Sequence, residues 1–141
     1  MKKVIIASDH AGFELKEHLK NAFAHIIEFT DIGTHSPASI DYPDVVHPLC
    51  ENVFQYDFGI LICGSGNGVC ITANKHKGIR AALAWKPEIA ALAKQHNDAN
   101  ILCLPARFIS FEEAENILHS FMQATFEGGR HQNRISKIEM I

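Results

Sequence analysis

The sequence predicts an α/β fold, a three-layer sandwich in which helices cover both faces of a five-stranded parallel sheet, as in flavodoxin-like and Rossmann-like proteins. Two observations carry this prediction. Five short apolar runs are spread along the 141 residues, and a segment with helical periodicity or helix-start signals separates each run from the next. Right-handed crossovers restrict how such strands connect, and 2-1-3-4-5 is the common five-stranded order. We therefore expect a single domain over residues 1–141 with this strand order.

The first half of the chain contains three of the expected strands. They are the apolar runs at 4–7, 26–29 and 58–62. Over residues 13–24, apolar side chains recur at near-helical spacing with charged residues between them, which predicts a helix. Residues 31–43 are rich in Gly, Ser, Pro and Asp, which is typical of a loop, and a second helix is expected from about residue 44 to residue 54.

The second half continues the alternation. We expect helices near 69–75, 87–95 and 111–125, and strands at 79–83 and 101–104. Pro87 stands in the first turn of its helix, where proline is tolerated. Ser110 and Glu113 have the spacing of a capping box, which marks the start of a helix. Two glycines at 128–129 break that helix, and residues 135–141 are predicted to form a short final one.

The stretch Cys63-Gly64-Ser65-Gly66-Asn67-Gly68 is the clearest functional signal. It follows the third strand and precedes a helix, so a thiol stands at a strand tip inside a glycine-rich turn. Glycine lets the backbone turn sharply and brings N–H groups close to a ligand. A helix N-terminus stabilises negative charge, including that of a thiolate. The segment is therefore a candidate for a catalytic base and for an anion-binding loop.

A second polar strand end, Ser8-Asp9-His10, follows the first strand. In the expected strand order the winding reverses between the first and third strands, and ligands bind outside the carboxyl ends of the strands at such a point. The two polar strand ends therefore converge on one predicted crevice.

The candidates also have structural interpretations. Free cysteine is usually a small buried residue, and Ser65 can simply shape its turn. Asp9 can cap the first helix, Tyr42 can anchor its loop, and 96–98 can be a helix end followed by a turn. Ordinary surface charge is the alternative for Arg130 and Arg134.

Composition excludes several classes of protein. The net charge of −3 argues against a general nucleic-acid-binding role, and no apolar run approaches membrane-spanning length. No signal peptide is visible, and the four cysteines lack paired spacing, so we expect reduced thiols in a cytoplasmic protein. Neither the cysteines nor the histidines show metal-ligand spacing, and we expect no metal and no cofactor.

Taken together, the motifs resemble those of ribose-5-phosphate isomerase B, in the wider group that includes galactose-6-phosphate isomerase subunits and allose-6-phosphate isomerase. The resemblance covers nearly the whole chain. Its fragments are Ser8-Asp9-His10-Ala11-Gly12, Asp31-Ile32-Gly33-Thr34, Asp41-Tyr42-Pro43, the Cys63–Gly68 loop, Ala73-Asn74-Lys75, Gln95-His96-Asn97-Asp98-Ala99-Asn100 and Gly128-Gly129-Arg130-His131-Gln132-Asn133-Arg134. Each fragment is weak alone, but their order and spacing together are specific.

The resemblance implies a metal-free aldose–ketose isomerase acting on a sugar phosphate. It implies that Cys63 is the base, that Ser65 and the N–H groups of the loop stabilise the enediolate, and that His96 opens the sugar ring. The loop residues implied to bind the substrate are Gly64, Gly66, Asn67 and Gly68. The residues implied to orient the sugar are Asp9, Tyr42 and Asn97, and those implied to hold the phosphate are His10, Arg107, Arg130 and Arg134.

Some members of this group use a glutamate just after the glycine loop, where this chain has Val69, so the chain resembles the cysteine-using branch. Pro105 stands just before Ala106-Arg107, where a glycine is common. The substrate expected is ribose 5-phosphate, interconverted with ribulose 5-phosphate. A hexose-6-phosphate isomerase and a non-catalytic phospholigand-binding module are the alternatives, and a binding module needs neither a thiol base nor a ring-opening acid.

The topology also predicts a homodimer, or a dimer of dimers. Cys63 lies at the carboxyl end of one expected strand, whereas His96 and Asn97 lie in the loop that leads into the amino end of another. One subunit cannot easily bring the two sets together, and a twofold-related neighbour can. The tail 126–141 is a candidate to pack on that partner subunit.

Overall fold

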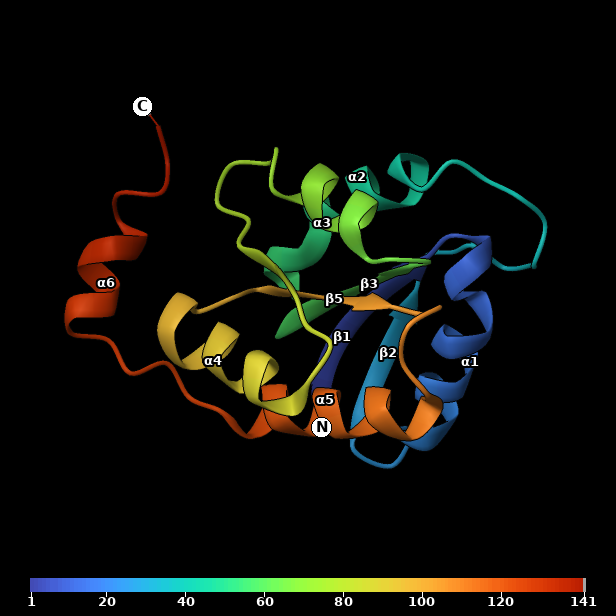
Figure 1. The fold of residues 1–141 in the computed structure, drawn as a ribbon. Coiled ribbons are helices and arrows are strands. Elements are labelled where there is room, and N and C mark those ends of the chain that lie inside the picture. Colours follow the sequence, from blue (N-terminus) through green and yellow to red (C-terminus); the bar gives the residue numbers. More distant parts are fainter. Residues whose placement is uncertain (141) are drawn as a thin grey trace.

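The computed structural model describes residues 1–140 and contains a five-stranded parallel sheet between two layers of helices (Figure 1). The strands are β1 (Lys2–Ser8), β2 (Ile27–Asp31), β3 (Phe58–Cys63), β4 (Ala81–Leu83) and β5 (Ile101–Pro105). The helices are α1 (Phe13–Ala22), α2 (Pro43–Asn52), α3 (Asn67–Ala73), α4 (Pro87–Asn97), α5 (Phe111–Gln123) and α6 (Arg130–Ile135), with short 3₁₀ turns η1 (His10–Gly12) and η2 (Val53–Gln55). The predicted fold class is confirmed.

The strand order is 2-1-3-5-4, so the expected order 2-1-3-4-5 is wrong in its last two positions. β5 lies beside β3, and β4 forms the edge of the sheet. All five residues of β5 are buried, whereas β4 has only three residues and all of them are partly exposed. A strand buried on both faces suits the interior of a parallel sheet. A very short strand suits the edge, because it presents few unpaired backbone N–H and C=O groups to other chains.

Alternate residues of the strands enter two separate cores. Ile6, Ile60 and Leu102 pack against the layer formed by α1, α4 and α5. Leu61 and Cys63 belong to the other core, which α2 and α3 cover (Figure 1). Because successive side chains of a strand point to opposite faces, the β3 residue that ends the strand directs its thiol toward the α2 and α3 layer.

Two element boundaries differ from the prediction. β4 begins at Ala81, because Gly78 adopts a φ of 80° and the Asn100 side chain binds the Arg80 N–H and the Gly78 carbonyl, both at 2.8 Å. The expected helix over 135–141 is also wrong, because helical structure starts directly after Gly129 and ends at Ile135. Residue 141 lies outside the described residues.

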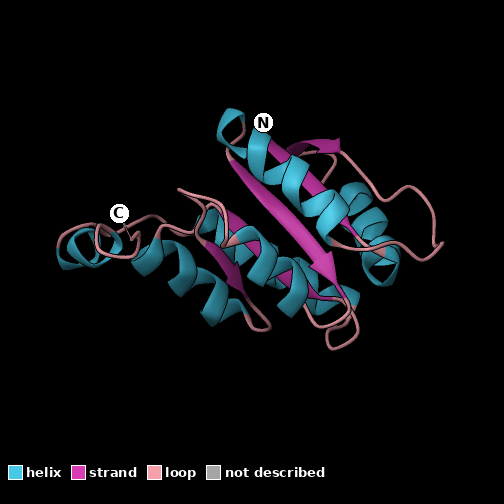
Figure 2. Ribbon diagram, turned by 90° about the horizontal axis from the view of Figure 1, so that it is seen from above, coloured by secondary structure: helices cyan, strands magenta, loops and turns pink. Residues whose placement is uncertain are grey.

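Figures 1 and 2 show the last segment of the chain extending to one end of the sheet, where α6 lies beside α4. The preceding helix, α5, begins at the predicted capping box: the Ser110 hydroxyl accepts from the Glu113 N–H, and the Glu113 carboxylate accepts from the Ser110 N–H. Within residues 1–140, no helix combines the length and the apolar composition needed to cross a bilayer.

Candidate active site

Cys63 ends β3 at its carboxyl end, and the residue is only 5% exposed. The loops that follow β3 and β5 are joined there. The Ala106 N–H donates to the Cys63 carbonyl at 2.9 Å, and the Arg107 N–H donates to the Gly64 carbonyl at 3.0 Å. This junction depends on the observed strand order, since only a strand adjacent to β3 can bring Arg107 to the cysteine loop.

The glycines of this loop allow close approach of other groups. Gly66 has a φ of 76°, and α3 begins at the next residue. A Cβ atom on Gly68 would lie 2.5 Å from Cζ of Tyr42, so the phenol ring rests directly against the loop. A Cβ atom on Gly64 would lie 3.0 Å from a guanidinium nitrogen of Arg107. The loop is thus held between an aromatic ring and a cation.

The carboxyl end of β1 meets this loop. The Asp9 N–H donates to the Ile62 carbonyl at 3.2 Å, and an Asp9 carboxylate oxygen accepts from the Gly12 N–H at 3.1 Å, which confirms the capping role. His10 accepts from the Ile40 N–H through Nδ1 at 3.2 Å, so a neutral His10 carries its proton on Nε2. The Asp9 carboxylate and the His10 imidazole therefore follow the carboxyl end of β1, next to the end of β3 that carries the Cys63 thiol.

The structural role of Ser65 is also confirmed, since its hydroxyl accepts from the Asn67 N–H at 3.2 Å. The hydroxyl hydrogen remains available to a ligand because Ser65 is exposed. The turn after α4 is confirmed as well: Asp98 caps the helix with a φ of 45°, and Arg80 donates to the Asn97 carbonyl at 2.9 Å.

His96 and Asn97 lie far from the cysteine loop in the same chain. They end α4 close to the amino end of β3, where the Gly59 N–H donates to the Asn100 carbonyl at 2.9 Å. Cys63 lies at the other end of that strand. A strand of this length spans roughly 17–20 Å. The structure therefore separates the predicted site residues into two groups within one subunit.

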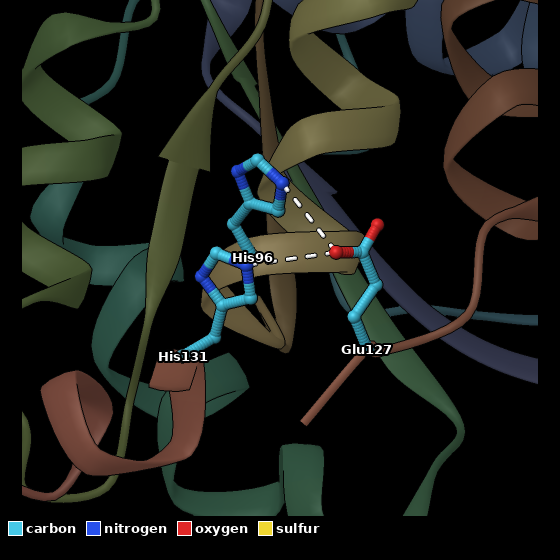
Figure 3. Close-up of side chains that lie close together, drawn as sticks. All are labelled: His96, Glu127 and His131. Atoms are coloured by element: carbon cyan, nitrogen blue, oxygen red, sulfur yellow. Dashed lines mark ion pairs between the residues drawn. The ribbon is translucent and has the colours of Figure 1, made fainter. Parts of the chain in front are cut away.

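The last helix joins the second group. Arg130 and Arg134 are exposed on α6 and one helical turn apart, as their spacing predicted. The His131 ring stacks on the His96 ring with centroids 4.1 Å apart and planes 11° apart. The Glu127 carboxylate faces both rings (Figure 3).

Sequence reasoning missed Glu127 and His131, because no spacing rule connects them with His96, about thirty residues earlier in the chain. They meet because the tail returns to α4, where the Glu127 N–H donates to the Gln95 carbonyl at 3.0 Å. Burial and the neighbouring charges of His96 and Arg130 lower the pKa of His131. A neutral ring at this position is consistent with its stacking on a second imidazole.

A second thiol deserves comparison with Cys63. A hydrogen bond from Cys103 lowers the pKa of Cys70 to about 7, whereas burial raises the pKa of Cys103 and raises that of Cys50 to about 11. The general expectation that a free cysteine is a small buried residue did not anticipate this hydrogen bond for Cys70. A lowered pKa favours the thiolate, so Cys70 competes with Cys63 for alkylating reagents, and substitution is the cleaner test of the role of Cys63.

The fold is that of an α/β protein with a thiol and a glycine loop at the carboxyl end of a central strand, and comparison with known proteins gives the family. The Ribose/Galactose Isomerase family pattern matches residues 4–138. The chain belongs to this family.

Individual relatives match nearly the whole chain. A probable ribose-5-phosphate isomerase B of Mycoplasma genitalium is 47% identical, covering 96% of this chain and 92% of that protein. The ribose-5-phosphate isomerase B of Escherichia coli is 41% identical, covering 100% and 97%. A solved ribose 5-phosphate isomerase of Thermotoga maritima has 49% identity and a TM-score of 0.96 over 99% of both chains. The Mycoplasma genitalium enzyme solved with bound ribulose-5-phosphate has 45% identity and a TM-score of 0.88, covering 96% and 93%.

Proposed function

We propose that this protein interconverts ribose 5-phosphate and ribulose 5-phosphate through an enediolate, and that it does so in the cytoplasm as a step of the non-oxidative pentose phosphate pathway. The observation that carries the proposal is the thiol of Cys63 at the head of a glycine loop, in a chain of the ribose/galactose isomerase family. The structure of a relative with bound ribulose-5-phosphate supports this substrate pair. The free thiols of all four cysteines suit a reducing compartment.

The reaction moves one proton between neighbouring carbons. The Cys63 thiolate takes the proton from C2 of the open-chain aldose, and the electron pair of the broken C–H bond forms the enediolate. A proton then passes from the C2 hydroxyl to the C1 oxygen, the thiol returns its own proton to C1, and the carbonyl forms at C2, which gives the ketose. Negative charge develops on the C1 oxygen, and Ser65 together with the N–H groups of Gly64, Gly66 and Gly68 stabilises it, while the Asn67 N–H holds the Ser65 hydroxyl in place. Donors aimed at such charge contribute a few kcal/mol.

Other side chains of the same loops orient the sugar. Asp9 uses one carboxylate oxygen for its cap, and the second accepts from a sugar hydroxyl. Tyr42 rests on Gly68 and is 36% exposed, so its ring is accessible to a sugar bound at the loop. His10 donates from Nε2 to the phosphate because Nδ1 already accepts from the backbone. Arg107, held over Gly64, adds a forked cation.

The second group acts from a twofold-related subunit. His96 protonates the ring oxygen and opens the sugar, Asn97 orients it, and Arg130 and Arg134 bind the phosphate. The position of α6, which extends beside α4 at one end of the sheet, supports packing of the tail 126–141 on the partner (Figure 2). The active unit is then a homodimer, or a dimer of dimers, with each site built from both chains.

An isomerase assay with several aldose phosphates tests the proposed reaction and its substrate. Purified protein is incubated with ribose 5-phosphate, allose 6-phosphate or galactose 6-phosphate, and ketose formation is followed. We expect the highest kcat/KM with ribose 5-phosphate. Preference for a hexose phosphate would give the hexose-6-phosphate alternative, and the absence of turnover with every aldose phosphate would leave a phospholigand-binding module.

Complementation between two variants tests whether each active site is built from both subunits. The Cys63→Ala and His96→Ala proteins, each expected to be inactive, are mixed under conditions in which subunit exchange is demonstrated by mass spectrometry. Each mixed dimer contains one site with both residues intact, so activity should return. Continued inactivity despite exchange would mean that both residues serve one site within a single chain.

A further inference from the structure

Three side chains that can bind a metal ion meet at the end of α4. Figure 3 shows the Glu127 carboxylate directed at the imidazole rings of His96 and His131. The Oε1 atom of Glu127 lies 3.7 Å from Nε2 of His96 and 3.5 Å from Nε2 of His131. Direct hydrogen bonds between N–H and O are about 2.7–3.2 Å long. The three groups therefore face one another without being joined by hydrogen bonds.

These distances match those between ligands in a metal coordination shell. Zn–N and Zn–O bonds are about 2.0–2.1 Å long, so two ligand atoms on a tetrahedral Zn²⁺ lie about 3.4 Å apart. Both contacts of Glu127 are within a few tenths of an ångström of that value. All three ligand atoms lie within 4.8 Å of one another, so the two imidazoles need to approach by about 1.4 Å at most.

The backbone holds two of the ligands in place and leaves the third able to adjust. The Glu127 N–H is bonded to the Gln95 carbonyl, next to His96 in the sequence, and the His131 side chain is only 9% exposed. The His96 side chain is 39% exposed, so its ring can turn out of the parallel stack to direct Nε2 at a shared ion. Three protein ligands leave a fourth position, and the half-exposed Glu127 keeps it open to water.

We propose that His96, Glu127 and His131 form a binding site for a divalent transition-metal ion, with Zn²⁺ as the reference case. Two imidazoles and one carboxylate are ligands that Zn²⁺ and Co²⁺ accept, whereas Mg²⁺ and Ca²⁺ prefer oxygen alone. Among residues 1–140, this is the one group of three or more such side chains within ligand distance.

Occupancy of the site inhibits the isomerase. The ion takes the lone pair on Nε2 of His96, so that nitrogen can no longer carry the proton that opens the sugar ring. This part of the proposal rests on the proposed function, in which His96 is the ring-opening acid. The ion is an inhibitor here and takes no part in the isomerisation. The exposed cations Arg130 and Arg134 lie close by and oppose its binding, while the Glu127 carboxylate offsets part of that charge.

The binding test uses Co²⁺, because its visible d–d absorption reports on coordination. The full-length protein is stripped with a chelator and titrated, together with the His131→Ala and Glu127→Gln variants. We expect one Co²⁺ per chain, bound at least about tenfold more weakly by both variants, since even indirect ligand changes cost 10–100-fold. Glu127→Gln keeps the test valid if His131→Ala does not fold, because Glu127 is half exposed.

Two control variants test whether Co²⁺ binds elsewhere on the protein. His47 and His76 form a separate exposed pair, with Nδ1 and Nε2 2.7 Å apart, and Cys70 is the accessible thiol with a lowered pKa. His47→Ala and Cys70→Ser should leave Co²⁺ affinity unchanged. Equal affinity in wild type and Glu127→Gln, or a sulfur-to-cobalt charge-transfer band that Cys70→Ser removes together with binding, would overturn the proposal.

The inhibition test measures ribose 5-phosphate isomerisation with added Zn²⁺, each variant compared with its own zinc-free rate. Glu127→Gln should need at least about tenfold more Zn²⁺ than wild type for half inhibition. Equal sensitivity in the two proteins would refute the inhibitory role. A protein that binds Co²⁺ at this site but isomerises no aldose phosphate would refute the proposed function and leave the metal site standing.

Discussion

The substitution Gly66→Ala tests the packing of the cysteine loop. Gly66 has a φ of 76°, and a Cβ atom at this position would lie 2.4 Å from Cδ1 of Leu83 and 3.2 Å from the backbone carbon of Leu104. The left-handed conformation costs an L-residue roughly 1–2 kcal/mol. Overpacking costs roughly 1–3 kcal/mol more. We expect a loss of about 2–5 kcal/mol in the free energy of unfolding, together with a large loss of kcat.

A double-mutant cycle separates the two costs. Leu83→Ala removes the colliding side chain but leaves the backbone conformation of Gly66 unchanged. In the Leu83→Ala background, Gly66→Ala should therefore cost only about 1–2 kcal/mol. Urea unfolding followed by circular dichroism measures all four proteins at one protein concentration, because subunit association contributes to apparent stability. An equal cost of Gly66→Ala in both backgrounds would refute the predicted collision with Leu83.

Three further outcomes are expected. Cys63→Ala should abolish isomerisation while ribose 5-phosphate still binds in calorimetry; full activity would exclude the thiol base. Arg134→Ala should raise KM at least tenfold and weaken inhibition by inorganic phosphate, and an unchanged phosphate affinity would return this arginine to the surface-charge interpretation. Asp31→Asn leaves the buried Lys16 without its carboxylate partner, so unfolding free energy should fall by about 3–5 kcal/mol. Burial raises the pKa of Asp31, but hydrogen bonds from Lys16, Lys20 and the Gly33 N–H outweigh it and hold the pKa below its ordinary 3.8. The resulting stabilisation exists above pH 3.8 and disappears as the pH falls through the lower folded value, so wild type should lose more stability on acidification than Asp31→Asn does.

Local signals in the sequence were enough to predict the element types and to single out the cysteine loop as a candidate site. Uninterrupted apolar runs predict buried strands, and Ser110 with Glu113 predicts a helix start, because these patterns act over a few neighbouring residues. The loop from Cys63 to Gly68 could be interpreted in the same way. Its glycines, thiol and position after a strand are consecutive in the chain, so no tertiary contact is needed to recognise them.

Tertiary structure alone decided how distant segments meet. Strand order depends on the competition between Ile101–Pro105 and Ala81–Leu83 for the buried position beside β3, and burial of whole strands is a property of the assembled sheet. That choice brings Arg107 to the cysteine loop. The separation of Cys63 from His96 follows from the direction of parallel strands. The group formed by His96, Glu127 and His131 exists because the tail returns to α4, a long-range contact that no local pattern in the sequence encodes.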